Sequence, residues 1–356
     1  MFTFDIYMKK KILVAPLNWG IGHATRCIPI INWLIDYNFE PIIASDGDAL
    51  NLLKKEFPKL KYETLPSYDI EYTKKGNNLK WKLIAQTPKV LKAKKAEKKI
   101  TATLVEKYNL SGIISDNRFG VRHKKVPSVF ITHQLNVLSG NTSQLSSKLH
   151  QGLMTKFDAI WVPDFKNEPS LSGKLGHTNE TNNSKLFYLG PLSRLNKTTT
   201  KEIYDIMVLI SGPEPQRSLL IKKLFTELKN YNGKIIFIKG VIEPKQTCEV
   251  NGNFTVYNFM TSKALEHAIN SSKVIICRSG YTTVMDLTKL GKKAFFIPTP
   301  GQFEQEYLAD YFNTLKLAPT CSQDQFTLNK LETITTYSGL NMEYTNPDLE
   351  ALFGLF

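Results

Sequence analysis

One short stretch combines glycines, whose backbone could approach a bound anion, with a histidine, whose imidazole could act as an acid or a base. The stretch covers residues 11–30 and reads KILVAPLNWGIGHATRCIPI. It predicts a buried strand, a glycine-containing loop over 18–22, and then a helix. Gly20 and Gly22 let the backbone turn tightly and approach a ligand, and the N–H groups of a helix start bind anionic or polar ligands. His23 follows directly, where we expect a substrate-facing side chain; the alternative is an ordinary strand-turn-helix unit with His23 as a solvated cap.

A second stretch of similar design begins at Arg278 and reads RSGYTTVMDL. It follows an expected strand over 274–277. Ser279 and Gly280 would form a turn whose exposed N–H groups cradle a phosphate or diphosphate. Asp286 lies one turn further on and could accept hydrogen bonds from ribose hydroxyls. The side chains expected to cap this helix are Thr282 and Thr283.

A third helix start is rich in amides and carboxylates that could bind sugar hydroxyls. It follows an apolar strand and the turn PTPG. The residues concerned are Gln302, Glu304, Gln305 and Glu306. For each of these pieces taken alone, the alternative is another ordinary turn between a strand and a helix.

Strands and helices alternate along both halves of the chain. The expected strands cover 12–15, 40–45, 62–65, 112–115, 126–132, 157–163, 186–192, 234–239, 254–257 and 274–277, with a further strand from Asp205. Such alternation predicts an α/β fold of parallel sheets with right-handed crossovers. We expect two Rossmann-like domains facing each other across a cleft, over 1–192 and 193–340, with a C-terminal tail over 341–356 that packs back on the first domain.

Polar side chains lie where several expected strands end, which is where parallel sheets place ligands. Asp116, Arg118 and His133 are candidates on this ground, and loop capping is the alternative. The triplet Asp46-Gly-Asp48 could hold a metal ion, as in some sugar transferases, but a turn with an N-cap explains it equally well. Residues 167–184 are rich in Gly, Ser and Asn and predict an exposed loop.

Charge and composition narrow the class of protein. The 356 residues carry a net charge of +14, and 15 Lys/Arg against 3 Asp/Glu fall within 74–125. This window, with Trp81, Leu83 and Ile84 among its lysines, predicts a surface for anionic lipid or nucleic acid; a solvated lysine-rich helix is the alternative. No apolar run approaches the ~20 residues of a membrane span. The four scattered cysteines argue against disulfides and a zinc site, so we expect a cytoplasmic protein.

The combined motifs resemble the GT-B glycosyltransferases of the MurG-like type, glycosyltransferase family 28 and its relatives. The resemblance covers roughly 9–340 and rests on Gly20-x-Gly-His23, on Arg278-Ser-Gly-Tyr-Thr-Thr-x-x-Asp286, and on Gln302-x-x-Gln305. It implies that His23 is the general base. The residues that it implies beside the donor are Gly20, Gly22, Ser211, Gly212, Phe259, Met260, Arg278, Ser279, Gly280, Tyr281, Thr282, Asp286, Gln302 and Gln305.

Within that set the resemblance assigns separate tasks. Phe259 and Met260 match the segment whose backbone recognises uracil, and the loop that begins at Arg278 matches the diphosphate-binding site. Asp286 stands where the family usually has a glutamate on the ribose. The turn after Ser211 departs from the family because its prolines remove N–H donors.

We therefore expect an inverting glycosyltransferase that uses a UDP-sugar as donor substrate and requires no metal or other cofactor. MurG itself acts on a lipid-linked peptidoglycan precursor, so the acceptor is expected to be lipid-linked or a cell-envelope glycan precursor. The protein would lie peripherally on the inner face of the cytoplasmic membrane. The alternative is a UDP-sugar hydrolase on the same fold, since Arg26 after the histidine is similar to such relatives. A nucleic-acid-binding protein is less favoured, because no nucleic-acid motif is present.

Overall fold

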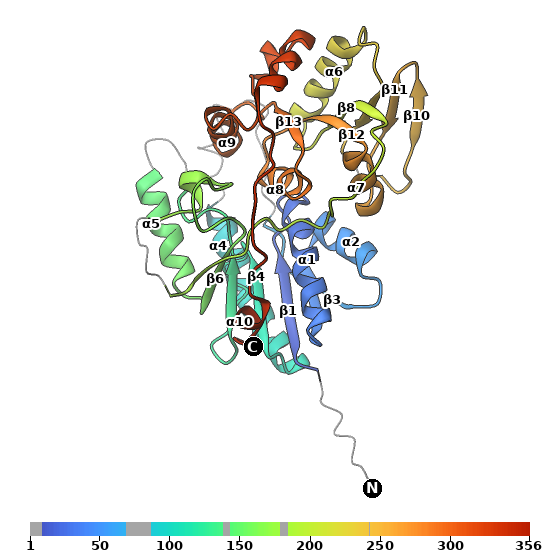
Figure 1. Cartoon of the computed structure of the whole chain (residues 1–356). Coiled ribbons are helices and arrows are strands. Elements are labelled where there is room, and N and C mark those ends of the chain that lie inside the picture. The colour runs from blue at the N-terminus through green and yellow to red at the C-terminus, as the bar shows by residue number, and fades with distance from the viewer. Residues whose placement is uncertain (1–8, 69–86, 138–142, 179–183, 242) are drawn as a thin grey trace.

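The structure is a computed structural model that describes residues 9–68, 87–137, 143–178, 184–241 and 243–356. The described residues form two α/β halves stacked one above the other (Figure 1). Trp81, Leu83 and Ile84 lie outside the described ranges. None of the described helices has the length and apolar character needed to cross a bilayer.

The first half is built on a parallel sheet of seven strands in the order β3-β2-β1-β4-β5-β6-β7. The strands are β1 (Lys11–Pro16), β2 (Glu40–Ser45), β3 (Lys61–Thr64), β4 (Gly112–Asp116), β5 (Ser128–Ile131), β6 (Ala159–Val162) and β7 (Leu186–Tyr188). The helices are α1 (Gly22–Asp36), α2 (Gly47–Glu56), α4 (Thr87–Tyr108) and α5 (Ser143–Met154), with the 3₁₀ turn η2 (Gly173–Leu175). Since β1 pairs with β4, their carboxyl ends lie side by side, with Pro16 opposite Asp116.

The second half has six strands in the order β10-β11-β9-β8-β12-β13. They are β8 (Tyr204–Leu209), β9 (Ile235–Ile238), β10 (Cys248–Asn251), β11 (Phe254–Tyr257), β12 (Ser272–Cys277) and β13 (Lys293–Phe296). The helices are α6 (Gln216–Leu228), α7 (Ser262–Asn270), α8 (Tyr281–Leu290) and α9 (Phe303–Thr314), with 3₁₀ turns η3 (Gln323–Gln325) and η4 (Leu328–Thr336). The last helix, α10 (Leu349–Phe353), follows them in the sequence but packs on the first half (Figure 1). The predicted α/β architecture with two parallel-strand sheets is confirmed. The antiparallel edge strand β10 was not predicted, because its residues are exposed and carry no apolar pattern.

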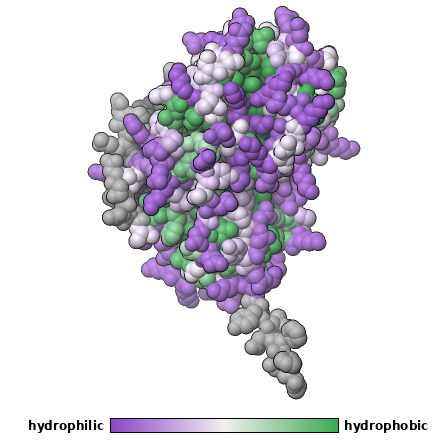
Figure 2. All heavy atoms as spheres, viewed as in Figure 1, coloured by the Kyte–Doolittle hydropathy of each residue, from purple (hydrophilic) through white to green (hydrophobic). Residues whose placement is uncertain are grey.

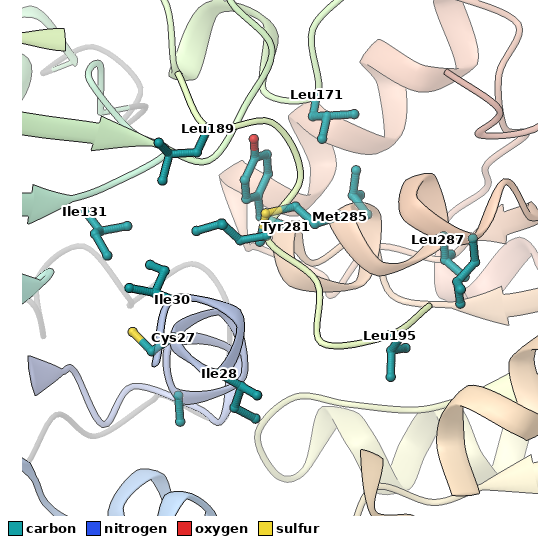
Figure 3. Close-up of a cluster of buried hydrophobic side chains, with 14 of the residues drawn as sticks. Cys27, Ile28, Ile30, Ile131, Leu171, Leu189, Leu195, Tyr281, Met285 and Leu287 are labelled. Carbon is teal, nitrogen blue, oxygen red and sulfur yellow. The ribbon is translucent and has the colours of Figure 1, made fainter. Parts of the chain in front are cut away.

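One apolar core joins the two halves. One cluster of buried side chains (Figure 3) contains Ile28 and Ile30 of α1, Tyr281 and Met285 of α8, and Leu189 from the segment after β7. Burying this surface is favourable at about 25 cal/mol per Å², so it fixes how α1 faces α8. The outer surface is largely hydrophilic on the face seen in Figure 2.

The chain end returns to the first half. Its last segment runs down across both halves and ends in α10 (Figure 1). The Phe353 and Phe356 rings lie 6.1 and 6.3 Å from the Trp161 ring, centroid to centroid. A Cβ on Gly112 would lie 2.2 Å from the Phe356 ring, so β4 needs glycine at this position.

The prediction of an exposed loop over 167–184 holds for 167–169 and was wrong for 170–173, which are buried. Ser170, Leu171 and Ser172 are fully buried. The Asp164 carboxylate accepts hydrogen bonds from the backbone N–H groups of Leu171 at 2.6 Å and Ser172 at 2.9 Å. A polar segment can be buried when a carboxylate satisfies its N–H groups, and polar composition alone does not reveal that.

Candidate active site

The predicted glycine loop lies directly against the predicted phosphate loop. Gly20 has φ +76°, which is the left-handed region that favours glycine. Gly22 opens α1, and a Cβ there would lie 2.7 Å from the Thr282 hydroxyl oxygen. A side chain at Gly22 would therefore require Thr282 to shift, so the two loops are in close contact. The fold brings together two motifs about 255 residues apart in the sequence.

His23 forms a hydrogen-bonded pair with a buried carboxylate. Its Nδ1 lies 2.8 Å from the Oδ1 of Asp116, the last residue of β4. The His23 side chain is 15% exposed and the Asp116 side chain is fully buried. When Nδ1 donates to Asp116, Nε2 carries the lone pair and can accept a proton. This is the arrangement of a general base with an orienting carboxylate.

Arg26 completes this site from the next turn of α1. Its side chain is 2% exposed. Its Nε donates to Asp116 Oδ2 at 2.6 Å, and a second guanidinium nitrogen donates to Asp116 Oδ1. Burial acts to raise the pKa of Asp116, but the charges and hydrogen bonds of Arg26 and His23 outweigh it and hold that pKa well below its usual range. Asp116 is therefore ionised at neutral pH.

The same environment keeps His23 neutral. Burial lowers the pKa of His23 from its usual 6.5; Asp116 opposes this, and the nearby Arg26 charge adds to it. A neutral imidazole at neutral pH is the form that acts as a base. The sequence pointed to His23 and raised Asp116 as a candidate. Arg26 was missed as part of the site, although its i, i+3 spacing from His23 places both on one helix face.

His133 connects this group to the second half. Its Nδ1 lies 3.1 Å from an Arg26 guanidinium nitrogen, and its Nε2 lies 3.1 Å from Glu304 Oε1 in α9. Its ring stacks on the Tyr281 ring with centroids 4.0 Å apart and planes 7° apart. Gln134 also donates to Glu304. The predicted sugar-binding carboxylate of Glu304 is therefore turned toward the first half, where it contacts His133 and Gln134.

Arg118 and Asp46 are structural residues. The Arg118 side chain is fully buried; it donates to Glu97 Oε1 at 2.8 Å, to the carbonyl of Pro16 at 2.9 Å, and to Asp46. The Asp46 side chain makes no capping bond to α2; Asn18 of the glycine loop accepts from Ala49 N instead, at 3.3 Å. Asp46 is thus the N-cap residue of α2, as the turn interpretation predicted, but its carboxylate pairs with Arg118 instead of capping the helix. Among the described residues, no group of three or more His, Cys, Asp or Glu side chains could hold a metal ion.

The predicted phosphate loop opens α8. Gly280 is the N-cap, and neither Thr282 nor Thr283 caps the helix, so that prediction was wrong. The backbone N–H groups of this first turn have no partner within the helix. The Ser279 hydroxyl donates to the Gln305 carbonyl at 2.7 Å, which ties the loop to α9.

Arg278 supports the loop from behind. Its side chain is buried and donates to the carbonyls of Ile297 at 3.1 Å, Pro298 at 2.9 Å and Gln216 at 3.0 Å. Burial lowers the pKa of Arg278 to about 10. The guanidinium thus holds three loops of the second half together.

The two predicted sugar-binding glutamines contact each other. Gln305 Nε2 donates to Gln302 Oε1 at 2.6 Å, and Gln305 Oε1 accepts from Thr299 N at 2.8 Å. Gly212 lies near Thr299, since its Cβ would be 3.8 Å from the Thr299 hydroxyl oxygen. Ser211 is exposed, and Gly212 has φ +107°. The turn at Ser211 and Gly212 therefore lies close to the start of α9, with Thr299 between them.

The predicted uracil segment touches the first half. The Lys55 ammonium of α2 lies 5.9 Å from the Phe259 ring centroid. The Ser262 hydroxyl, two residues beyond Met260, donates to Glu56. The first half therefore contacts this segment through α2.

Asp286 faces the segment that connects the two halves. Ser193 donates to its Oδ1 at 2.5 Å. Burial raises the pKa of Asp286 to about 6, although Arg194 and Ser193 oppose the shift. Arg194 carries buried nitrogens without a hydrogen-bond partner among the described residues. The sequence did not single out Arg194, since it lies in no recognised motif.

Comparisons with known families and proteins show what this chain resembles. Residues 214–348 match the model of the glycosyltransferase family 28 C-terminal domain. The UDP-N-acetylglucosamine--N-acetylmuramyl-(pentapeptide) pyrophosphoryl-undecaprenol N-acetylglucosamine transferase of Haemophilus ducreyi is 26% identical over 208 residues, which is 56% of this chain and 55% of that protein. An uncharacterized glycosyltransferase of Methanosarcina acetivorans is 23% identical and covers 83% of this chain and 81% of its own. The alignment with the Haemophilus protein therefore spans only about half of that relative.

Solved structures match over nearly the whole chain. MurG of Acinetobacter baumannii superposes with a TM-score of 0.57 at 16% identity, covering 98% of this chain and 99% of its own. The glycotransferase of kitacinnamycin superposes with a TM-score of 0.66 at 13% identity, covering 98% and 94%. These superpositions show that the chain has the GT-B fold of the solved glycosyltransferases. Its residues 214–348 are similar to the C-terminal domain of glycosyltransferase family 28, and its most similar relatives include MurG-type transferases.

Proposed function

We propose that this chain is an inverting glycosyltransferase that moves a sugar from a UDP-sugar to an acceptor hydroxyl. The observation that carries the proposal is the pair of His23 and Asp116, 2.8 Å apart, beside the start of α8. His23 Nε2 would take the proton of the acceptor hydroxyl as its oxygen attacks the anomeric carbon. The Asp116 carboxylate would stabilise the imidazolium that forms. Attack from the face opposite the departing UDP inverts the configuration.

The leaving group would be stabilised by backbone donors. The N–H groups at the start of α8, from Tyr281 to Thr283, lie at the positive end of the helix dipole. Oriented donors of this kind stabilise a developing diphosphate charge. The proposal therefore requires no metal ion, and turnover is expected to persist in a chelator.

A donor panel tests the proposal. UDP-, GDP- and TDP-sugars would be screened by thermal shift and by release of nucleotide, with and without acceptors. Stabilisation by UDP-sugars and acceptor-dependent UDP release would support it. Release of UDP at the same rate without any acceptor would instead indicate the hydrolase.

The proposed contact between Asp286 and the ribose gives a pH-dependent prediction. Replacing Asp286 by alanine is expected to weaken UDP binding by about 1–3 kcal/mol, the cost of one to two lost hydrogen bonds. Because the pKa of Asp286 is about 6, its carboxylate accepts hydrogen bonds from the ribose above this pH. As the pH falls through this value, the carboxylate becomes protonated and that acceptance weakens. The Asp286 contribution is therefore present at pH 7–8 and lost near pH 5. Calorimetry across this range measures it.

Asp286→Asn serves as the control. The terminal phosphate of UDP also ionises near pH 6, and it does so equally for both proteins. The difference in the pH dependence of UDP affinity between wild type and Asp286→Asn therefore reports on the Asp286 carboxylate alone. Unchanged UDP affinity in the alanine variant would remove Asp286 from the binding site.

The acceptor is proposed to be lipid-linked, as a cell-envelope glycan precursor would be. The name of the Haemophilus relative includes pyrophosphoryl-undecaprenol as part of the acceptor. The described part of the basic window offers a matching surface on α4, where Lys92, Lys95 and Lys99 are exposed and Leu91 is 59% exposed. We propose that this surface binds the inner face of the cytoplasmic membrane; nucleic acid is not expected as a partner.

Liposome binding tests this surface. Each lysine near an anionic bilayer contributes about 1 kcal/mol, and salt screens the attraction. Binding is expected to need acidic lipid, to fall at high salt, and to weaken when Lys92, Lys95 and Lys99 are changed to glutamate. A variant with Lys201, Lys229 and Lys234 changed to glutamate has the same net charge and should bind as wild type. If the protein does not bind acidic liposomes at low salt, a water-soluble acceptor becomes the better hypothesis.

A further inference from the structure

The glycine loop is fixed at its first residue, Asn18, by the start of α2. Asn18 Nδ2 donates to Asp46 Oδ2 at 3.2 Å, and Asn18 Oδ1 accepts from the backbone N–H of Ala49 at 3.3 Å. Ala49 is the third residue of α2, and its N–H is one of those that an N-cap side chain usually binds. Asn18 therefore caps α2 from a distant part of the chain.

Each atom of the Asn18 amide faces a partner of only one kind. The Asp46 carboxylate can only accept and the Ala49 N–H can only donate, so the orientation of the amide is determined. Asp46 is held in turn, because its Oδ1 accepts from the buried Arg118 guanidinium. An aspartate at position 18 could accept from Ala49 but could not donate to Asp46.

The triplet Asp46-Gly47-Asp48 accommodates this contact. Gly47 has φ +50°, and a Cβ on it would overlap the Asn18 amide nitrogen. Glycine at this position therefore gives the amide room beside α2. The sequence of the triplet allowed a metal site, whereas the structure shows it in contact with Asn18.

The loop that follows Asn18 leads directly to the proposed base. Residues 19–21 are exposed, and the glycines of the loop permit many backbone conformations. Such a loop keeps one path only if both of its ends are held. His23, 2.8 Å from Asp116, holds the far end, and the Asn18 amide holds the near end.

We propose that Asn18 is a positioning residue for sugar transfer, whose amide sets the path of the glycine loop between β1 and His23. The loop lies against the start of α8, where Gly22 is close to Thr282, so its path determines where His23 stands relative to the donor side. The inference rests on the proposed role of His23 as the base. It adds that the contact of Asn18 with the start of α2 is needed to place that base.

Exchanging the side chains at 18 and 46 tests the contact. Asn18→Asp places two carboxylates against each other, and Asp46→Asn places two amide N–H groups against each other. In the double variant, the amide at 46 donates to the carboxylate at 18, and its oxygen still accepts from Arg118. Both bonds of the wild-type contact are therefore re-formed with the same net charge. Assays near pH 8, well above the usual pKa of an aspartate, keep the carboxylates ionised.

Asn253→Asp is the matched control, since it makes the same chemical change away from the site. Asn253 Nδ2 donates to the Gly233 carbonyl at 2.9 Å, next to the amino ends of β9 and β11, whereas the glycine loop follows the carboxyl end of β1. Thermal melting confirms that each variant is folded. If a variant at 46 does not fold, Asn18→Asp and its control decide the inference alone.

Fluorine-19 NMR of full-length protein labelled with 5-fluorotryptophan follows the loop without any substrate. The signal of Trp19, the residue after Asn18, is assigned by its loss in Trp19→Phe. It is expected to shift in Asn18→Asp and in Asp46→Asn, to return most of the way in the double variant, and to stay unchanged in Asn253→Asp. An unchanged signal in Asn18→Asp, or an equal shift in the double variant, overturns the proposal.

Turnover with the UDP-sugar found in the donor panel is the second readout. Asn18→Asp is expected to lower kcat about a hundredfold, as a misplacement of about 1 Å can, while UDP affinity stays within about threefold of wild type because the proposed phosphate donors belong to α8. The double variant should recover most of kcat. Near-normal kcat in Asn18→Asp, a loss shared by Asn253→Asp, or no recovery in the double variant overturns the proposal. If wild type turns over no UDP-sugar, the proposed function fails, and the fluorine spectra still decide whether the Asn18 contact sets the loop.

Discussion

Replacing His23 by alanine is expected to lower the rate of sugar transfer by about 10²–10⁴, the usual contribution of a general base. In the proposed mechanism, His23 Nδ1–H donates to the Asp116 carboxylate, 2.8 Å away, which leaves Nε2 to accept the proton. UDP affinity is expected to change little, because the base would touch the acceptor rather than the nucleotide. Initial rates and calorimetry with UDP measure the two effects.

His267→Ala is the control for this experiment. His267 is an exposed residue in the last turn of α7 and lies outside the proposed site. Its replacement should leave rates and UDP affinity unchanged. Near-normal transfer by the His23 variant would remove His23 as the base, and Asp116 or His133 would then be tested in its place.

Replacing Arg118 by alanine is expected to lower the free energy of unfolding by about 3–5 kcal/mol, the cost of breaking a buried ion pair. The guanidinium is fully buried between Glu97 and Asp46. Its removal leaves the Glu97 carboxylate buried without a cation, and burial already raises the pKa of Glu97 while Arg118 opposes that shift. Denaturant unfolding monitored by fluorescence measures the change.

Lys61→Ala is the matched control, because Lys61 forms an exposed ion pair with Glu40 at 2.8 Å. Surface pairs of this kind contribute little to stability, so the unfolding midpoint should hardly move. If Arg118→Ala unfolded like wild type yet lost UDP binding or turnover, Arg118 would act directly in the site, and the structural assignment would be wrong.

The sequence by itself determined the architecture and the two loops that face each other. Apolar strands alternate with helices, and this pattern depends only on local periodicity, so it predicted β1, β2, β11 and α7 within a residue or two. The motifs at His23 and at Arg278 were likewise readable, because a glycine turn between a strand and a helix has a local signature. The resemblance to MurG-like enzymes came from these same motifs.

Tertiary structure decided which side chains act together. His23, Asp116, His133 and Glu304 are spread over about 280 residues of sequence, and no pattern within a window relates them. Asp116 ends β4 and Arg118 lies two residues further on, yet Asp116 contacts His23 and Arg26, whereas Arg118 is enclosed by Glu97 and Asp46. A buried charge must find its counter-charge wherever the fold brings one within reach. That pairing depends on strand register and on the packing of α1 against α8, which are set by the whole apolar core and not by the residues nearby in the chain.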